Sequence, residues 1–318
     1  MSVRPRGAVR SDQDMVIERE TPEVDGLGEA LDALRTWQDD AAPLQLHPGD
    51  VGWFWRFGAT ATAAAVRTWR RDGRVVAVGL LDGPDLLRLG IAPDLQRDDE
   101  LARRLAEDAG RPERGVLGEG GASVEAPVGA LVDEHLAAAG WRVDERWALL
   151  RRDLAAPVEE PGVRVREVGP PEAAAWAETL RSSFGGTRAA PERWHALATG
   201  LPYADARCLV VHDGSPGGGP SDGETPDGGP RPAVAVIGVW SAGPGRPGLI
   251  EPMGVHADHR GRGLGRAVTL AGLAALRALG ASSALVATPA SNVGGVATYV
   301  SAGFTHLPER FDRRREAG

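Results

Sequence analysis

The feature that most constrains the fold is a glycine-rich turn, Arg260-Gly261-Arg262-Gly263-Leu264-Gly265, between a predicted strand and a predicted helix. The run Leu249 to Val255 predicts the strand, and the apolar run Arg266 to Leu279 predicts the helix. The first N–H groups of a helix have no internal partner and form the positive end of its dipole. Because glycines let a bulky anion approach the backbone and arginines add donors, the turn predicts a pyrophosphate-binding cradle.

The spacing of the glycines identifies the kind of cradle. The turn lacks the GK[ST] ending of a Walker A loop, and its glycines are not spaced as in GxGxxG. For the six residues alone, a basic surface turn without a ligand remains the alternative. Arg260, Gly263 and Gly265 do fit R/Q-x-x-G-x-G/A, the coenzyme A motif of the GNAT superfamily of acyl-CoA-dependent N-acyltransferases, and the turn therefore resembles that motif.

A second signature of the same superfamily lies about 27 residues downstream. It consists of an asparagine, a tyrosine seven residues later, and a Gly-Phe pair four residues after the tyrosine. The chain has this spacing at Asn292, Tyr299 and Gly303-Phe304. Two motifs in the right order indicate that the segment from Val163 to Arg310 resembles a GNAT domain.

The resemblance implies an activity and a binding site. GNAT enzymes transfer an acetyl group from acetyl-CoA directly to an amine, here of a small molecule or peptide, and need no metal. By resemblance, Tyr299 protonates the departing thiolate, as a phenol protonated at neutral pH can do. The backbone of Met253 to Val255 diverges from the neighbouring strand and binds the pantetheine arm. The predicted cofactor-binding residues are Met253, Val255, Arg260, Gly261, Arg262, Gly263, Leu264, Gly265, Arg266 and Asn292.

The general base has two candidates. Glu251 lies on the strand before the cradle, on the side of Met253 and Val255 if side chains alternate, and could accept the amine proton directly or through water. His256 is the second candidate, since its reference pKa suits proton transfer. Purely structural roles remain as alternatives. Glu251 could be a solvated surface residue, Tyr299 could only pack in the core, and Asn292 could only cap its helix.

Near-constant offsets indicate an internal duplication. Gly140-Trp141 corresponds to Gly303-Phe304, and the segment 91–94 corresponds to 255–258. At the position of the cradle, the first copy has Gln96-Arg97-Asp98-Asp99-Glu100-Leu101. Three consecutive acids would repel a pyrophosphate and fill its space, and Leu136 replaces the tyrosine. The first copy is therefore predicted to be degenerate: a scaffold, or else part of the acceptor pocket or a regulatory site.

The predicted fold class is α/β (α+β), with two GNAT-like domains, each a mixed, mostly antiparallel central sheet flanked by helices. Residues 16–155 form the degenerate domain and residues 156–318 the acetyltransferase domain. Residues 1–15 are expected to be a disordered tail. Residues 213–231, rich in glycine and proline, are expected to form a flexible loop.

Hydrophobic periodicity predicts alternating strands and helices in both halves. The predicted helices are 21–40, 99–109, 128–139, 171–184, 266–279 and 292–302. The predicted strands are 74–81, 86–91, 146–154, 163–167, 208–212, 233–240, 249–255 and 283–288.

Composition excludes several classes of protein. A single cysteine, Cys208, allows neither an intrachain disulfide nor a zinc site of several thiolates, and is predicted to face the core. The net charge of -8 argues against a nucleic-acid partner. The sequence has no apolar run long enough to span a membrane, and its charged first residues do not resemble a secretory signal. We therefore expect a cytoplasmic protein without a membrane partner.

The sequence leaves the acceptor and the oligomeric state open. Trp194, His195 and Tyr203 are candidates for the acceptor side, although aromatic residues near loops often only pack locally. A non-catalytic acyl-CoA-binding sensor or regulatory protein is the competing functional hypothesis. The intact tyrosine at the acid position favours the enzyme.

Overall fold

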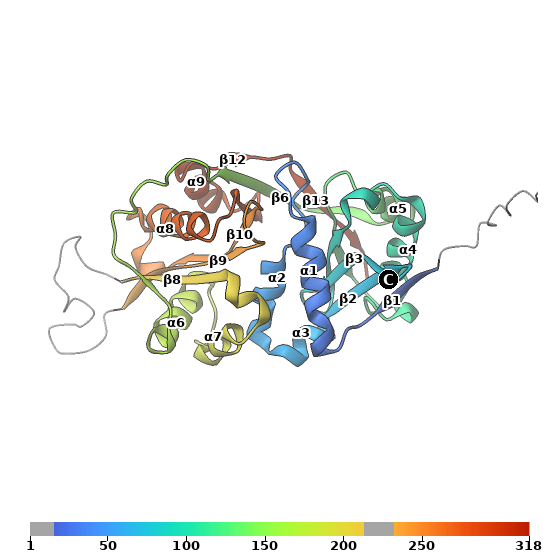
Figure 1. Cartoon of the computed structure of the whole chain (residues 1–318), viewed down its shortest axis with the longest axis horizontal. Coiled ribbons are helices and arrows are strands. Elements are labelled where there is room, and N and C mark those ends of the chain that lie inside the picture. Colours follow the sequence, from blue (N-terminus) through green and yellow to red (C-terminus); the bar gives the residue numbers. More distant parts are fainter. Residues whose placement is uncertain (1–15, 213–231, 318) are drawn as a thin grey trace, which may run out of the picture.

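The computed structural model describes residues 16–212 and 232–317, and shows two lobes that share one continuous sheet (Figure 1). The predicted mixed α/β class with a mostly antiparallel sheet is confirmed. The segments 1–15 and 213–231, expected to be disordered or flexible, lie outside the described residues. Below, the first half means residues 16–155 and the second half residues 156–317.

The first half contains the predicted strands at 74–81 and 86–91 with these bounds, and several elements that the sequence did not predict. Its strands are β1 (Ile17–Glu20), β2 (Val66–Arg71), β3 (Arg74–Leu81), β4 (Leu86–Ile91), β5 (Ala122–Glu125) and β6 (Arg142–Asp153). Its α-helices are α1 (Leu27–Trp37), α2 (Pro48–Phe54), α3 (Ala59–Ala65), α4 (Asp99–Gly110) and α5 (Leu131–Ala138).

The second half follows the predicted order closely. Its strands are β7 (Val165–Glu167), β8 (Ala206–His212), β9 (Ala233–Ser241), β10 (Gly248–Val255), β11 (Ser283–Pro289), β12 (Thr305–His306) and β13 (Arg310–Arg315). Its α-helices are α6 (Ala173–Phe184), α7 (Pro191–Ala198), α8 (Leu264–Ala278) and α9 (Val293–Ser301). The predicted pair β8 and β9 is antiparallel.

Both halves repeat one arrangement around the sheet. The strand order is β1-β2-β3-β4-β5-β13-β6-β11-β10-β9-β8-β7, and only the pairs β4/β5 and β10/β11 are parallel. In the first half, the apolar side chains of α1 lie in a core on one side of the strands and those of α4 and α5 in another. In the second half, α6 and α7 share one core while α8 and α9 share another. Each half is therefore a sheet between two helical layers, as a duplication requires.

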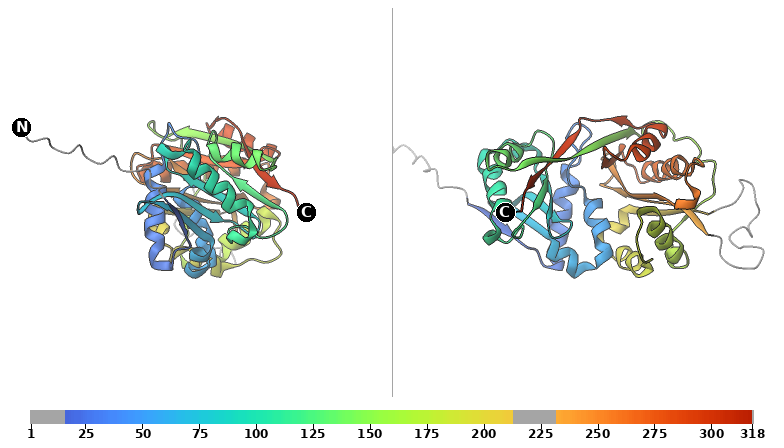
Figure 2. Two further views of the ribbon diagram at one scale, coloured as in Figure 1. Left: turned by 90° about the vertical axis from the view of Figure 1, so that its right-hand side faces the viewer. Right: turned by 180° about the vertical axis from the view of Figure 1, so that it is seen from behind.

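The two halves exchange their last strands. β6, which ends the first half, pairs with β11 of the second, and β13, which ends the chain, pairs with β5 of the first. Figure 2 shows both strands crossing between the lobes. The sheet thus continues across residue 155, and the expected division into two domains at that residue stays a prediction. The exchange also fixes the position of one half relative to the other.

A close contact of α2 with Trp240 holds the lobes together. A Cβ on Gly49 would lie 2.5 Å from the Cβ of Trp240, and a Cβ on Gly52 would lie 2.4 Å from its ring. His47, which caps α2, lies 3.1 Å through Nε2 from the carbonyl oxygen of Pro247. Glycine is therefore required at both positions of this short helix, which the sequence pattern did not predict.

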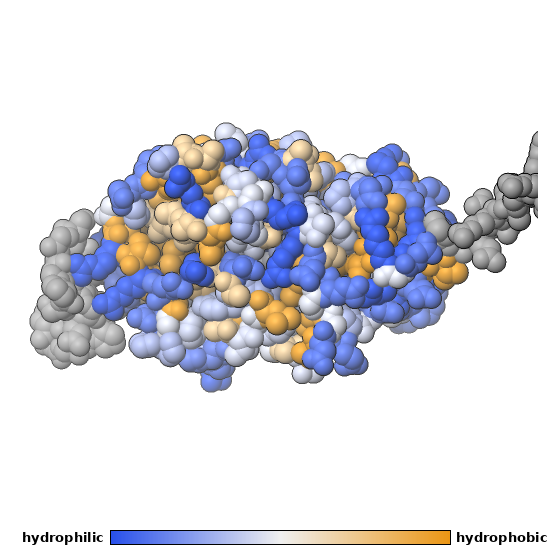
Figure 3. Space-filling model, in the orientation of Figure 1, coloured by the Kyte–Doolittle hydropathy of each residue, from blue (hydrophilic) through white to orange (hydrophobic). Residues whose placement is uncertain are grey.

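The surface shows no continuous apolar band on the face of Figure 3, where hydrophilic residues surround separate apolar patches. In the parts of the chain that the structure describes, no helix is both long and apolar enough to cross a membrane.

Candidate active site

Strand β10 separates from β11 in the middle of the second half. Parallel pairing joins them only at Gly248 and Leu249, whereas β11 continues beside β6 as far as Pro289. On its other side, β10 pairs with β9 up to Val255, with a register shift between Ile250 and Met253. The backbone of Met253 to Val255 therefore has no strand partner on the β11 side, as the resemblance implied.

The glycine-rich turn leads from this free strand edge into α8. Gly261 and Gly263 have φ values of +74° and +77°, a backbone conformation that residues with a Cβ disfavour. A Cβ at either position would lie in open space. Gly263 is the N-cap of α8 and makes no side-chain capping bond, so the first N–H groups of the helix stay available. Arg260 donates to the carbonyl oxygen of Ser183 at 2.7 Å, which ties the turn to the end of α6.

The corresponding turn of the first half is closed by its own carboxylates. The side chain of Asp98 accepts from the N–H of Leu101 at 2.8 Å and pairs with Arg71 at 2.7 Å. Asp99 lies 2.9 Å from Nε2 of His135. The start of α4 therefore already holds an anionic group where α8 leaves its N–H groups available, and a second anion would be repelled.

A cavity of about 550 Å³ opens where β10 and β11 diverge. Both halves of the chain line it, because the exchanged strands β13 and β6 join β4 and β5 to β11 and β10 in one sheet. Among its lining residues are Asp50, Trp53, Asp82, Arg88, Glu125, Trp147, Phe184, Glu251, Met253, Thr288, Asn292, Tyr299 and Arg310. The cavity thus unites Glu251 and Tyr299, the predicted base and acid, with charged groups of the first half.

Tyr299 lies on α9 and is 6% exposed. Its ring packs edge to face on Phe304, with 5.6 Å between centroids. Burial, together with the nearby Glu251, raises the pKa of Tyr299, so the phenol stays protonated at neutral pH. Asn292 caps the same helix: its Oδ1 accepts from the N–H of Gly295 at 3.1 Å, and its Nδ2 donates to Thr288 at 3.0 Å.

Glu251 belongs to a buried cluster with Asp50 and Arg88. Nη2 of Arg88 lies 2.7 Å from Asp50, and Nη1 lies 3.8 Å from Glu251. Burial and the negative Asp50 raise the pKa of Glu251 well above its usual value. Burial opposes ionisation of Asp50 as well, yet Arg88 and hydrogen bonds hold the pKa of Asp50 below its usual value. The two shifts are opposite in direction, so the environment favours the protonated form at Glu251 and the ionised form at Asp50.

The cluster continues toward the exchanged strands. Glu125 on β5 lies 3.1 Å from Nε of Arg88 and 2.9 Å from Nη1 of Arg310 on β13. Arg310 also pairs with Asp312 at 3.2 Å, and the indole of Trp147 donates to Asp312 at 2.9 Å. Burial and Glu125 raise the pKa of Asp312 to about 6. This network links β4, β5, β6 and β13 along one wall of the cavity.

Other sequence candidates lie elsewhere. His256 is outside the cavity lining; its Nδ1 accepts from the N–H of Asp258 at 3.4 Å, and its ring packs edge to face on His259. Tyr203 packs between Trp194 and Trp240, while His195 is exposed. Cys208 is buried, as predicted. Among the described residues, no group of His, Cys, Asp and Glu is arranged to hold a metal ion.

The fold is a two-lobed arrangement of the GNAT type. Residues 190–304 match the model of the acetyltransferase (GNAT) family, so the second half contains a GNAT acetyltransferase domain. The whole chain has the fold of tandem GNAT proteins.

Known proteins support both statements. A mycothiol acetyltransferase of Thermobispora bispora is 45% identical over 58 residues, which are 18% of this chain and only 20% of that protein. The match to a tandem GNAT protein from the clavulanic acid biosynthesis pathway extends over 95% of this chain and 99% of that protein. The identity is 19% and the TM-score is 0.57. The match to a GCN5-related N-acetyltransferase from Sphaerobacter thermophilus extends over 95% of this chain and 96% of that protein. The identity is 18% and the TM-score is 0.56. At this level of identity the two structures show the fold alone.

Proposed function

We propose that the chain is an acetyl-CoA-dependent N-acetyltransferase with one active site, in the cavity between the two halves. The acceptor is the amine of a small molecule or peptide. The observation that carries the proposal is that Glu251 and Tyr299 line one cavity, where β10 and β11 diverge next to the uncapped start of α8. A cytoplasmic location stays a prediction from the sequence.

Acetyl-CoA fits the turn before α8 and the free edge of β10. The N–H groups at the start of α8 and the arginines of the turn suit the pyrophosphate. The free edge of Met253 to Val255 suits the amides of the pantetheine arm. A side chain at Gly265 would lie 3.0 Å from Thr298, so glycine here also allows α8 and α9 to approach.

The proposed reaction forms an N–C bond and breaks the thioester C–S bond. The attacking nitrogen loses a proton, and the departing sulfur gains one. Glu251 accepts the first proton, directly or through water, once it is ionised. Tyr299 donates the second, because its raised pKa keeps its hydroxyl protonated. An ammonium group that enters the cavity favours the ionised form of Glu251, since opposite charges lower a carboxyl pKa.

The first half contributes the electrostatics of the acceptor side. Asp50, Asp82 and Glu125 join Glu251 at the cavity, against Arg88 and Arg310. This excess of carboxylates attracts a cationic amine. Of the alternatives considered for the degenerate copy, a part in the acceptor pocket is therefore favoured.

A non-catalytic acyl-CoA sensor is the competing hypothesis. A sensor needs the cradle but has no use for an acid and a base facing the same cavity. Release of free coenzyme A thiol over a panel of amines separates the two, because only the enzyme releases thiol in an amine-dependent way. Binding of acetyl-CoA without any such release would favour the sensor.

Acetyl-CoA is expected to bind with a stoichiometry of one per chain in titration calorimetry. Gly263→Ala should weaken binding roughly 5- to 30-fold, because a left-handed alanine costs about 1–2 kcal/mol. The matched change Asp99→Gly, in the closed turn of the first half, should alter neither affinity nor stoichiometry. A stoichiometry near two would contradict a degenerate first copy.

The pH dependence of kcat/KM should follow the titration of the carboxyl pair Glu251 and Asp50. Activity should fall as the pH drops through the raised pKa of Glu251, because the base becomes protonated. We call this fall in activity the acid limb of the profile. Asp50→Asn removes the neighbouring negative charge and leaves Arg88 to favour ionised Glu251. The acid limb should therefore move to a pH about one unit lower. Asparagine keeps an oxygen for the N–H of His47 that caps α2.

Two controls accompany this profile. Glu251→Gln should remove the acid limb, and Asp94→Asn, at an exposed ion pair with Arg74, should leave the limb in place. An acid limb at the same pH in wild type and Asp50→Asn would show that the pair is not the titrating base.

A further inference from the structure

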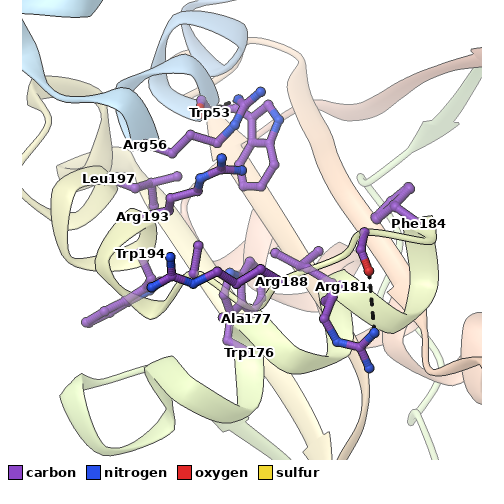
Figure 4. A pocket seen from close by; sticks show the side chains of 13 residues that line it. Trp53, Arg56, Trp176, Ala177, Arg181, Phe184, Arg188, Arg193, Trp194 and Leu197 are labelled. Atoms are coloured by element: carbon purple, nitrogen blue, oxygen red, sulfur yellow. Dashed lines mark hydrogen bonds between the residues drawn. The ribbon is translucent and has the colours of Figure 1, made fainter.

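A second hollow of about 280 Å³ lies between α2, α6 and α7, next to the active-site cavity. Figure 4 shows that Arg56 and Trp53 approach from the first half, while Arg188 and Arg193 approach from the second. Trp176 and Trp194 form apolar parts of its wall, and none of its lining residues is acidic. We call this hollow the arginine pocket.

Four arginines line the arginine pocket, and one of them pairs with a carboxylate among the residues that the structure describes. Arg181 pairs with Glu178, but Arg56, Arg188 and Arg193 have no carboxylate within ion-pair distance among the residues that the structure describes. The chain has an excess of acids over arginines, and the buried Arg88 contacts several of them. Three guanidinium groups without a carboxylate at one hollow therefore mark a local excess of positive charge.

Aromatic rings hold two of these groups together. The guanidinium carbon of Arg56 lies 4.3 Å from the ring centre of Trp53 and 4.4 Å from that of Phe57. Arg193 lies over the same Phe57 ring at 5.4 Å. Burial and repulsion by Arg193 and Arg88 lower the pKa of Arg56 to about 10, despite the opposing effect of Asp82 and Glu251. A bound anion would relieve this repulsion.

The arginine pocket adjoins the active-site cavity. Trp53 and Phe184 line both hollows, so a ligand that passes these two rings reaches from one hollow into the other. One end of such a ligand would meet the carboxylates around Glu251. Its other end would meet the guanidinium groups.

We propose that the acceptor carries an oxyanion, a carboxylate or a phosphate, which binds Arg56, Arg188 and Arg193 while its amine faces Glu251. The tryptophans favour an apolar or aromatic body between the two charged ends. The identity of the amine-binding end rests on the proposed function. The oxyanion site rests on the arginine pocket alone.

Binding of three matched dipeptides tests the oxyanion site without requiring catalysis. The probes are glycyl-phenylalanine, its C-terminal amide, which has no oxyanion, and glycyl-phosphotyrosinamide, titrated into the full chain by calorimetry. The two probes that carry an oxyanion, called the anionic probes, should bind at least about tenfold more tightly than the C-terminal amide, and added salt should reduce the difference. The carboxylate and phosphate arms show which oxyanion is preferred. Equal affinity for all three, or no binding of either anionic probe, would overturn the proposal.

Single-site variants assign the effect to the pocket. Arg188 and Arg193 are exposed, so Arg188→Gln and Arg193→Gln should fold normally and should each reduce anionic-probe affinity about tenfold. Arg103→Gln, at an exposed arginine of α4, is the matched control and should change nothing. Unchanged affinity in both pocket variants would refute the assignment.

Acetyl transfer to the same probes separates the two proposals. Transfer to all three probes with equal kcat/KM would leave the proposed function standing and refute the oxyanion site. Tight, arginine-dependent binding without amine-dependent thiol release would support the site and refute the enzyme.

Discussion

Arg88→Met is expected to lower the free energy of unfolding by about 3–5 kcal/mol, the usual cost of leaving buried charges without their partner. The side chain of Arg88 is 13% exposed, and those of Asp50 and Glu125 are 3% and 5% exposed. Methionine nearly fills the volume but leaves both carboxylates without this cation. Urea unfolding, followed by tryptophan fluorescence and circular dichroism, measures the change.

The pH dependence of this loss identifies its cause. Without Arg88, the pKa of Asp50 should rise, and protonation of this carboxylate should relieve its unpaired charge as the pH falls. The difference between wild type and Arg88→Met should therefore shrink toward acidic pH. Arg97→Met, at an ion pair that is exposed on both sides, should cost little at any pH. A loss below about 1 kcal/mol in Arg88→Met would mean that the cluster is solvated.

Much of the fold followed from local patterns in the sequence. β3 and β4 were predicted with their observed bounds because each is a short apolar run next to a turn of Asp82, Gly83 and Pro84. The predicted helix 266–279 differs by only one or two residues from α8, because its long apolar run ends at Gly280. In these segments, local propensity and tertiary packing favour the same structure.

Other elements could not be predicted because long-range contacts determine them. The sequence of α2, PGDVGWF, resembles a loop, and its glycines are explained only by the approach of Trp240. The sequence of β13, RFDRRR, lacks an apolar pattern. Two of its arginines form ion pairs with carboxylates that are distant in the sequence: Arg310 pairs with Glu125 and Arg313 with Asp133.

The candidate site divides in the same way. Glu251 and Tyr299 were found because family motifs lie beside them in the sequence. Asp50, Glu125 and Arg310 were missed, because the packing of α2 on Trp240 and the strand exchange bring them to the cavity. One signal for the missed cluster was present: Arg88 is a charged residue inside the apolar strand LLRLGI, and a charge buried in a strand requires partners.

Tyr299→Phe is expected to reduce the rate of acetyl transfer by roughly 10²-fold or more, which corresponds to about 2.7 kcal/mol of transition-state stabilisation. The change removes one hydroxyl and keeps the ring that packs on Phe304. The turn before α8 and the edge of β10 are untouched, so acetyl-CoA affinity should stay within about twofold. Steady-state kinetics with a reactive amine and titration with acetyl-CoA measure the two quantities.

The second tyrosine of the chain provides the matched control. Tyr203→Phe also removes a partly buried hydroxyl, but Tyr203 packs between Trp194 and Trp240 and lines neither hollow. Its effect should be on stability, with turnover nearly unchanged. An aromatic ring that only packs would give this pattern at Tyr299 as well. Equal turnover in wild type and Tyr299→Phe would therefore mean that water or another group protonates the thiolate, and Tyr299 would lose its proposed role as the acid.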